Sequence, residues 1–434
     1  MDNKRKLITK HKKKNVRMFP IYKAISWDFL FYYSIIFLFL TQVKGFSASQ
    51  VLFSDSIYTI SSMFWQIPIT RIIDKIGKKN CLIIGNILYT LSVLAMIFMN
   101  NYYELLMIQF IYALGYSIKG LCESNILYDS LPNSKKRGHI FSKIDGKSSS
   151  YFYIFDALAC IIAGFTFVIN GYIPMILCFI CCLISTSMSF KFRHTNIVEE
   201  KVEPVKLKTY IGQLRDSFKY FVKSKRIRTL IIFNAIFMGI MFGIGNLRSS
   251  ILLDLKIPNQ YFGVIFAVLQ LIAAFTSRKT EGIQNVFKNK TLAYLSVPVV
   301  FSCLLIGIIG NTGNNTTTFI LIFIMFAIQY SIKGPFMALM NRYLNNFTNR
   351  NIRPKISAAK SLSSNLFTAF ISMLCALLLQ FSSTANIFII IGCITTIIVV
   401  LLLDYMRDKV GLKPEQYKNE DIKYSLNRPE IKES

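Results

Sequence analysis

Twelve apolar runs, each long enough to cross a lipid bilayer as a helix, constrain this chain more than any other feature of its sequence. A helix needs roughly 20 mostly apolar residues to cross the hydrocarbon core. Hydrophobic residues make up 53% of the 434 positions, and they are gathered in blocks of that size. The predicted spans are residues 22–41, 49–69, 80–100, 104–130, 148–169, 172–190, 229–252, 259–277, 291–310, 316–340, 357–381 and 385–403. We therefore expect an all-α membrane protein with twelve transmembrane helices.

A five-residue repeat indicates how these spans are organised. The sequence Tyr-Ser-Ile-Lys-Gly occurs at residues 116–120 and again at residues 330–334, an offset of 214 residues, each time in the fourth span of its half. Internal repeats are typical of secondary transporters built from two similar halves, so we expect two pseudo-symmetric six-helix halves. The predicted segments are a basic N-terminus at 1–21, a first half at 22–190, a connection with a surface helix at 191–228, a second half at 229–403 and a polar tail at 404–434.

The distribution of basic residues predicts the topology. The net charge is +28, yet the predicted outer connections carry only Lys44 and Lys256. Because basic residues are retained on the cytoplasmic side, we expect both termini in the cytoplasm and the chain in the cell membrane as a multi-pass protein. Charge of this kind does not require nucleic acid as a partner. The basic cluster at residues 4–17 is expected to contact anionic lipid headgroups.

The sequence contains no pattern that indicates catalysis or a cofactor. All nine cysteines fall within predicted spans and all three histidines in predicted cytoplasmic segments, so neither set has the spacing of a metal site. The sequence also lacks a Gly-x-x-x-x-Gly-Lys-Ser/Thr loop, which argues against ATP as the direct energy source. We expect no enzymatic activity, no cofactor and no bound metal.

The connection between the second and third spans resembles a family signature. Residues 68–79 read Pro-Ile-Thr-Arg-Ile-Ile-Asp-Lys-Ile-Gly-Lys-Lys. This is similar to the loop Gly-x-x-x-Asp-(Arg/Lys)-x-Gly-(Arg/Lys)-(Arg/Lys) of the major facilitator superfamily, with threonine in place of the first glycine. The resemblance implies the major facilitator fold, in which two six-helix halves rock about a central site and expose it alternately to the two sides of the membrane.

The same resemblance implies a conformational latch at the cytoplasmic ends of the helices. Asp74 would face the start of a helix at residues 356–360, where the helix dipole favours negative charge. Lys78 would pair with Asp129. The residues of the predicted latch are Asp74, Lys75, Gly77, Lys78 and Asp129.

Two further stretches, at residues 127–131 and 143–147, resemble a bacterial branch of this superfamily that includes many drug exporters. The resemblance implies export of a small organic solute. Residues 156–164 lack the Gly- and Pro-rich motif of the proton-coupled exporters, which leaves uptake open as an alternative.

Ionisable residues inside the spans are costly to bury and are therefore candidates for function. Lys119 and Glu123 lie four residues apart on one helix face and can pair directly. A carboxylate beside a lysine in a partly dry cavity has a tunable pKa, which proton coupling requires. The alternatives are a purely structural pair, a solvated Asp28 near the interface, and a helix–helix hydrogen bond for Asp156. We predict that Glu123, Asp28 and Asp156 carry the coupling proton.

The second lysine of the repeat, Lys333, has no acidic residue within one turn of its own helix. This favours an anionic solute, although an acid from another helix could also pair with it. Arg248, near the outer end of the seventh span, is expected to reach the interface. The predicted solute-binding residues are Lys119, Lys333, Asn125, Gln329 and Tyr116.

These features predict a monomeric secondary active transporter that moves a small organic solute by alternating access. Proton-coupled export is the favoured reading, because ionisable side chains lie within the spans. An uptake permease for an organic anion is the alternative within transport. From a different class, a membrane receptor or scaffold without transport activity would tolerate neutralisation of Lys119 and Lys333, whereas a transporter would not.

Overall fold

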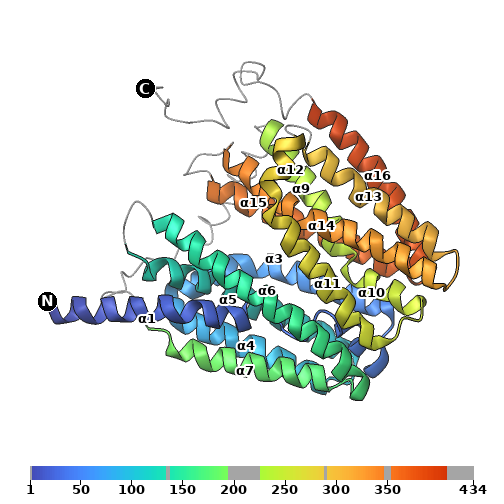
Figure 1. The fold of residues 1–434 in the computed structure, drawn as a ribbon. Helices are drawn as coiled ribbons and strands as arrows, with labels where there is room; N and C mark the ends of the chain where they lie inside the picture. Colours follow the sequence, from blue (N-terminus) through green and yellow to red (C-terminus); the bar gives the residue numbers. More distant parts are fainter. Residues whose placement is uncertain (1, 133–136, 194–224, 288–290, 347–352, 408–434) are drawn as a thin grey trace, which may run out of the picture. The chain divides into compact units, whose positions relative to one another are not determined.

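The computed structural model describes residues 2–132, 137–193, 225–287, 291–346 and 353–407, and in these ranges the regular structure is entirely helical (Figure 1). The predicted surface helix within the 191–228 connection and most of the predicted tail lie outside the described residues. The chain divides into two compact units. Unit 1 is Met1–Lys206 with Pro258–Val268, and unit 2 is Leu207–Ile257 with Leu269–Ser434. The exact segment boundaries drawn from the sequence stay a prediction.

The described helices are assigned to the two units as follows. Unit 1 contains α1 (Asp2–Ser26), α2 (Ile36–Leu38), the π-helix η1 (Phe39–Val43), α3 (Ala48–Ile76), α4 (Lys78–Phe98), α5 (Tyr102–Ser130), α6 (Arg137–Ile169) and α7 (Ile173–Lys191). Helix α11 (Asn259–Arg278) begins in unit 1 and ends in unit 2. Unit 2 further contains α9 (Lys225–Gly243), α10 (Gly245–Asp254), α12 (Thr280–Phe287), α13 (Thr291–Gly310), α14 (Thr316–Asn346), α15 (Arg353–Leu378) and α16 (Thr384–Arg407).

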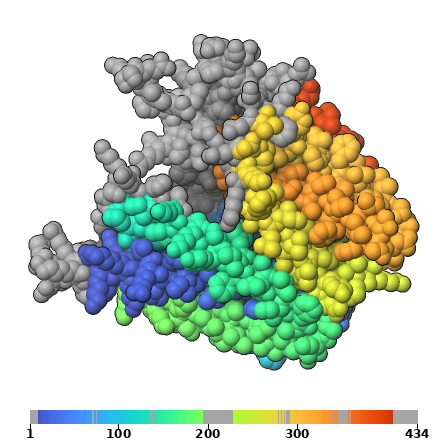
Figure 2. All heavy atoms as spheres, viewed as in Figure 1, coloured from blue at the N-terminus to red at the C-terminus, as the bar shows by residue number. Residues whose placement is uncertain are grey.

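The helices confirm the predicted all-α membrane fold. Ten stretches of the described residues are long and apolar enough to cross a membrane, and they coincide with the third to twelfth predicted spans. The second predicted span lies within the 29-residue helix α3. In unit 1, α1 packs against both α6 and α7, and the three helices lie together on the face shown in Figure 2.

The first predicted span is not a continuous helix, and this corrects the sequence-based expectation for residues 22–41. Helix α1 ends at Ser26, and regular helix resumes only at Ile36, in a short turn that continues as the π-helix η1. Within the interruption, Phe31 adopts a φ of 62°, a left-handed conformation that is uncommon for a residue with a side chain. Interrupted membrane helices expose backbone carbonyl and amide groups and are typical of binding sites in transporters.

The seventh predicted span, residues 229–252, is interrupted as well. Helix α9 ends at Gly243 and α10 begins at Gly245, with Ile244 between them at a non-helical φ and ψ of −94° and 14°. The 214-residue offset of the repeat aligns Ile244 with Leu30, which lies inside the first interruption. The first span of each half therefore departs from helical geometry at an aligned position, over residues 27–35 in unit 1 and at the single residue Ile244 in unit 2.

Two local features set the geometry of unit 1. Gly77 separates α3 from α4 with a φ of 87°, a left-handed value at which a side chain would be strained. Gly85 of α4 and Gly115 of α5 allow those two helices to approach closely, because a Cβ on Gly85 would lie 2.9 Å from the backbone nitrogen of Lys119. This close approach accompanies a short distance of 4.0 Å between the Tyr89 ring centre on α4 and the Lys119 ammonium on α5.

Candidate solute and proton site

The Lys119 side chain holds the broken end of α1. It is buried, with 1% of its surface exposed. Its ammonium group donates to the carbonyl oxygen of Ser26, the last residue of α1, and at 3.4 Å to that of Trp27. The carbonyls at a helix C-terminus lack partners in their own helix and carry partial negative charge, so a buried cation stabilises them.

Glu123 lies one turn further along α5 and is also bound to α1. Its carboxylate oxygen Oε1 accepts hydrogen bonds from the Tyr22 hydroxyl at 2.8 Å and from the Ser26 hydroxyl at 3.3 Å. The expected direct pair between Lys119 and Glu123 is not formed among the described side chains, because each of the two groups instead bonds to the end of α1. The helix spacing made the pair possible, and the packing of α1 against α5 replaced it.

Asp28 is the single acidic residue among residues 27–35, the interruption of the first span. Its oxygen Oδ1 accepts three hydrogen bonds, from the backbone amide of Phe29 at 2.9 Å, the Tyr33 hydroxyl at 2.9 Å and the Tyr89 hydroxyl at 3.2 Å. The alternative of a fully solvated carboxylate does not fit this geometry, because Asp28 is partly buried with protein donors on one oxygen, and its role in proton coupling stays a prediction. Hydrogen bonds from hydroxyl groups are strong when the acceptor is a carboxylate.

Aromatic rings surround this carboxylate, and several of them were not singled out in the sequence. The Lys119 ammonium lies 4.0 Å from the centre of the Tyr89 ring and 5.7 Å from that of Tyr116. Phe29 stacks on both Tyr89, at 3.9 Å, and Tyr112, at 4.8 Å. Tyr89 and Tyr112 occupy spans three and four, where tyrosines are common, so no sequence pattern distinguished them.

A pocket with a volume of about 90 Å³ lies beside Lys119 within unit 1. Its walls are Phe19, Lys23, Trp27, Tyr116, Lys119, Gly120, Glu123 and Ser124. It thus brings together three of the predicted site residues, Tyr116, Lys119 and Glu123, with aromatic walls and a second lysine. The sequence did not single out Lys23, which lies at the predicted start of the first span.

Lys23 is buried and has its own acidic partner. Its ammonium lies 2.5 Å from an Asp145 carboxylate oxygen on α6 and 4.5 Å from the centre of the Trp27 ring. The charge of Lys23 is therefore balanced by Asp145, whereas Asp28 and Glu123 share the vicinity of Lys119.

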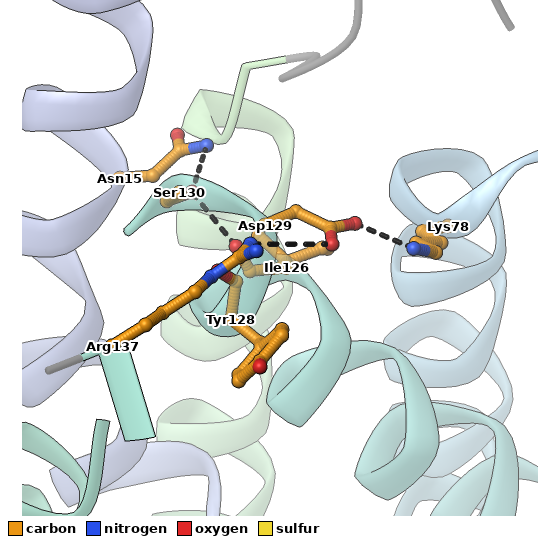
Figure 3. A network of polar contacts seen from close by, with 7 residues as sticks. All are labelled: Asn15, Lys78, Ile126, Tyr128, Asp129, Ser130 and Arg137. Atoms are coloured by element: carbon orange, nitrogen blue, oxygen red, sulfur yellow. Dashed lines mark hydrogen bonds and ion pairs between the residues drawn. The ribbon is translucent and has the colours of Figure 1, made fainter. Parts of the chain in front are cut away.

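The predicted pair of the latch is present. Lys78, at the start of α4, lies 2.5 Å from Asp129 near the end of α5, and Arg137 approaches the same carboxylate at 3.9 Å (Figure 3). Arg137 also donates to the Tyr128 carbonyl oxygen and lies over the Tyr128 ring at 4.0 Å. Lys75 is exposed. The side chain of Asp74 lies outside the described residues, so its predicted role stays a prediction.

Three other predicted residues do not join the pocket. Asn125 is exposed on α5 and is not among the pocket walls. Asp156 is buried on α6, and its oxygen Oδ1 lies 3.9 Å from the Cys160 thiol. Gln329 is buried in unit 2, where it accepts a hydrogen bond from Arg248 at 3.0 Å and donates one to Ser302 at 2.9 Å.

Arg248 was expected to extend to the membrane–water interface, and the structure corrects this expectation. Its side chain is 3% exposed, and it donates to the Met241 carbonyl oxygen at 3.0 Å. The 214-residue offset aligns Met241 with Trp27. Both halves therefore place a buried cation on the carbonyl of the same repeat position, beside the break in their first helix.

Lys333, the repeat partner of Lys119, lies on α14 and is partly buried. Its ammonium is 4.6 Å from the centre of the Phe242 ring and 5.6 Å from that of Tyr330. The offset aligns Phe242 with Asp28 and Met337 with Glu123. Unit 2 thus carries apolar residues at the repeat positions where unit 1 has its two acids.

Within the described ranges, no group of three or more His, Cys, Asp and Glu side chains is arranged to hold a metal ion. The described side chains of the site offer carboxylates, ammonium groups, hydroxyls and aromatic rings. These groups can bind charged or polar solutes and can hold or release protons.

A multi-pass helical chain with ionisable side chains buried around an interrupted span has the architecture of a solute transporter. The profile of the Major Facilitator Superfamily matches residues 22–333, and the chain belongs to this family. It is therefore a transporter rather than an enzyme. A sequence search of curated proteins gave no match.

Solved structures share the fold at low sequence identity. The nucleoside transporter NupG superposes with a TM-score of 0.72 at 11% identity, covering 92% of this chain and 99% of that one. A POT family transporter in complex with 5-aminolevulinic acid gives 0.66 at 16% identity, covering 95% and 97%. A D-xylose-proton symporter gives 0.64 at 12% identity, covering 92% and 97%. At these levels of sequence identity, the similarities establish the fold and do not identify the solute.

Proposed function

We propose that this chain is a proton-coupled secondary active transporter that exports a small organic solute across the cytoplasmic membrane, with both termini in the cytoplasm. Solute and proton would meet in unit 1, at the pocket and the adjoining break in the first span. The observation that carries the proposal is the burial of Lys119 and Glu123 around the broken end of α1. Buried ionisable groups inside a membrane are costly and are retained where they serve transport.

Glu123 is the strongest candidate for the coupling proton. It lines the pocket, is 5% exposed and accepts hydrogen bonds from two hydroxyl groups. Protonation would weaken the hydrogen bonds that the Glu123 carboxylate accepts from the Tyr22 and Ser26 hydroxyls. It would also remove the negative charge one helical turn from Lys119. A group whose protonation changes the packing of α1 against α5 links proton binding to conformation. Asp28 and Asp156 are the further candidates.

Export is the proposed direction because residues 127–131 and 143–147 resemble a branch rich in exporters. The cytoplasmic position of the termini is proposed from the concentration of basic residues on one side of the predicted topology. We further propose that the basic residues of α1 bind anionic lipid headgroups and that the protein acts as a monomer. These basic residues include Lys10, Lys13, Lys14 and Arg17, whose side chains are exposed.

Uptake of an organic anion is the second candidate function. It is favoured by Lys333, a partly buried lysine in the middle of α14 that is flanked by the Phe242 and Tyr330 rings. A solute carboxylate paired with this ammonium would be recognised in surroundings of low dielectric constant, where the attraction is strong.

Purified protein in liposomes that enclose a pH-sensitive dye tests the proposal. A panel of organic cations, anions and neutral solutes should include members that cause a saturable, solute-dependent proton flux. Glu123→Gln should abolish this flux and flatten the pH dependence of solute binding. Glu104→Gln, the same change at an exposed position on the same helix, is the matched control and should behave as wild type.

Solute movement that saturates without any proton flux would overturn proton coupling while retaining transport. Equal proton flux in wild type and Glu123→Gln would remove Glu123 from the mechanism. Flux of organic anions alone, lost in Lys333→Gln, would favour the second candidate function.

A further inference from the structure

We propose that the broken end of α1 is a binding site for a primary ammonium group. The Lys119 side chain fills it here, and the amine of a transported solute fills it when Lys119 withdraws. The inference rests on the proposed transport function and names the chemical class of the solute. In this role the Lys119 ammonium, which is covalently part of the chain, competes with the solute amine for the same carbonyl oxygens. It does not serve to attract an anion.

The backbone of α1 supplies the first component of the site. The carbonyl oxygens of Ser26 and Trp27 point at the Lys119 ammonium. Because the chain leaves the helical path after Ser26, the last carbonyls of α1 lack the amide donors that a continuing helix would provide. The negative end of the helix dipole adds to their attraction for a cation. A primary ammonium has three N–H donors and no acceptor, which matches a set of carbonyl oxygens.

Aromatic faces supply the second component. The Lys119 ammonium lies over Tyr89 at 4.0 Å and within 5.7 Å of the Tyr116 ring centre. The negative face of a tyrosine ring attracts cations, and the attraction grows when the cation is desolvated, as it is here. Tyr89 also donates its hydroxyl to Asp28, so one residue links the ring face to the nearby carboxylate.

The carboxylates near Lys119 outnumber the ammonium groups that are available to balance their charge. Asp28 and Glu123 both lie near the end of α1, with hydrogen bonds to residues of α1 or of the interruption. The other buried lysine of the pocket, Lys23, is already paired with Asp145 at 2.5 Å. The two carboxylates thus lie in the field of a single ammonium that forms no ion pair with either of them among the described side chains, and either a proton or a solute cation can supply the remaining positive charge. An amine and a proton would thus compete to neutralise the same excess of negative charge.

The pocket supplies the space into which Lys119 can withdraw. Its walls include Lys119 itself and, further along α5, Gly120, Glu123 and Ser124. A Cβ placed on Gly120 would meet nothing within 4 Å, so this wall is open. A lysine side chain has four rotatable methylene groups and reaches such a volume without movement of its backbone.

Unit 2 provides the contrasting case. Near Ile244, where α9 gives way to α10, the Arg248 guanidinium donates one hydrogen bond to the Met241 carbonyl oxygen and another, at 3.0 Å, to the Gln329 side chain. A planar guanidinium that is 3% exposed and bound to two partners is more restrained than an ammonium group on a flexible side chain. The exchangeable cation therefore belongs to unit 1, where the holding groups are carbonyls and ring faces beside a pocket.

Replacement of Lys119 by alanine removes the equivalent of an n-propylammonium ion, and this defines the experiment. The chain has two tryptophans, so Trp65→Phe leaves Trp27, a wall of the pocket, as the single fluorescent reporter. In the Trp65→Phe/Lys119→Ala protein, n-propylamine hydrochloride should cause a saturable change in Trp27 fluorescence. The half-saturating concentration should be at least about tenfold lower than in Trp65→Phe alone, which corresponds to about 1.4 kcal/mol.

The matched control is Trp65→Phe/Lys23→Ala/Asp145→Asn, which removes the other lysine of the same pocket together with its acidic partner, so that no unpaired carboxylate remains to attract the amine, and which does not free the Ser26 and Trp27 carbonyls. It should show no gain in amine binding. The neutral analogue n-propanol and the anion propionate, at equal concentration and ionic strength, should have no effect on either variant. Asp28→Asn added to Lys119→Ala should weaken propylamine binding.

Thermal unfolding gives a second readout, which also covers poor folding of the alanine variant. The unfolding midpoint of Lys119→Ala, or of the length-preserving Lys119→Met if the alanine variant is not recovered, should fall below that of wild type. Propylamine should raise the midpoint of Lys119→Ala, and no amine should raise that of Lys119→Met, whose side chain fills the space. Failure to recover both variants from membranes that yield Lys23→Ala would contradict the proposal, because an exchangeable occupant cannot be indispensable for folding.

The inference is overturned if Lys119→Ala binds propylamine no better than Lys23→Ala/Asp145→Asn does, or binds propionate equally well. Proton-coupled flux of a non-amine solute in the liposome assay, with no amine rescue, would remove the amine site and leave the transport function standing. Amine rescue without any solute-dependent flux would retain the site and remove the transport function.

Discussion

The Lys78 ammonium lies 2.5 Å from the Asp129 carboxylate, and this contact joins the first residue of α4 to the penultimate residue of α5. Arg137, the first residue of α6, approaches the same carboxylate at 3.9 Å (Figure 3). One acidic residue thus ties together the ends of three consecutive helices at the end of unit 1 that the sequence predicts to be cytoplasmic.

We expect Asp129→Asn to lower the transport rate severalfold with little loss of stability. The Lys78 and Asp129 side chains are 41% and 22% exposed, and partly solvated ion pairs contribute less than about 1 kcal/mol to folding. The charge-swapped double variant Lys78→Asp/Asp129→Lys should recover part of the rate, because it restores the attraction. Transport and thermal unfolding on the same preparations provide the measurement. An unchanged rate in Asp129→Asn would show that the ion pair is not part of a latch.

Gly85→Ala should destabilise the protein, whereas Gly120→Ala should not. A Cβ at Gly85 would lie 2.9 Å from the Lys119 backbone nitrogen, so α4 and α5 must separate, and overpacking of this kind costs about 1–3 kcal/mol. At Gly120 the added methyl group meets nothing within 4 Å, and alanine favours the helix by about 0.5–1 kcal/mol. A lower unfolding midpoint for Gly85→Ala and an equal or higher one for Gly120→Ala are expected. The reverse order would contradict the close packing of these helices.

Arg248→Met should lower the free energy of unfolding of unit 2 by about 1–3 kcal/mol, because it leaves the buried Gln329 amide oxygen and the Met241 carbonyl without their donor. The double variant Arg248→Met/Gln329→Leu removes both sides of one bond and should lose less than the sum of the single changes. Thermal or denaturant unfolding of the four proteins completes the cycle. Additive losses would show that the two side chains act independently.

Labelling of introduced cysteines in intact cells should place residues 101–103 and 311–315 outside the cell. Residues 135–143 and the 191–228 connection should be labelled only after the cells are opened. The expectation follows from the scarcity of basic residues in the predicted outer connections and their abundance elsewhere. A cysteine-free background is required because the chain has nine cysteines. External labelling within the 191–228 connection would reverse the predicted orientation.

Several structural features could be predicted from residues close together in the chain. Runs of apolar residues predict membrane spans because a helix satisfies its own backbone hydrogen bonds in lipid. The signature at residues 68–79 led to the Lys78–Asp129 pair through its family resemblance. The repeat at residues 116–120 and 330–334 singled out Lys119 before its surroundings were known. Each of these predictions depends on local pattern or on a motif.

The interruption of the first span was not predictable in the same way. Residues 27–35 contain neither glycine nor proline and continue the apolar run without a change in composition. The break is stabilised from other helices, since Lys119 and Tyr89 supply the donors that the carbonyls of α1 and the Asp28 carboxylate accept. A helix that loses its own hydrogen bonds inside a membrane requires such partners, and they come from positions 61 or more residues away in the chain.

The sequence by itself determined that the chain crosses a membrane many times, that it has two related halves and that a lysine lies within the fourth span of each. Only the tertiary structure decided which groups those lysines contact. Lys119 binds α1 rather than Glu123, and Arg248 binds Met241 rather than the interface. The physical reason is that helical periodicity specifies which face is buried, whereas a buried charge bonds to whichever acceptors the packing of distant helices brings within reach.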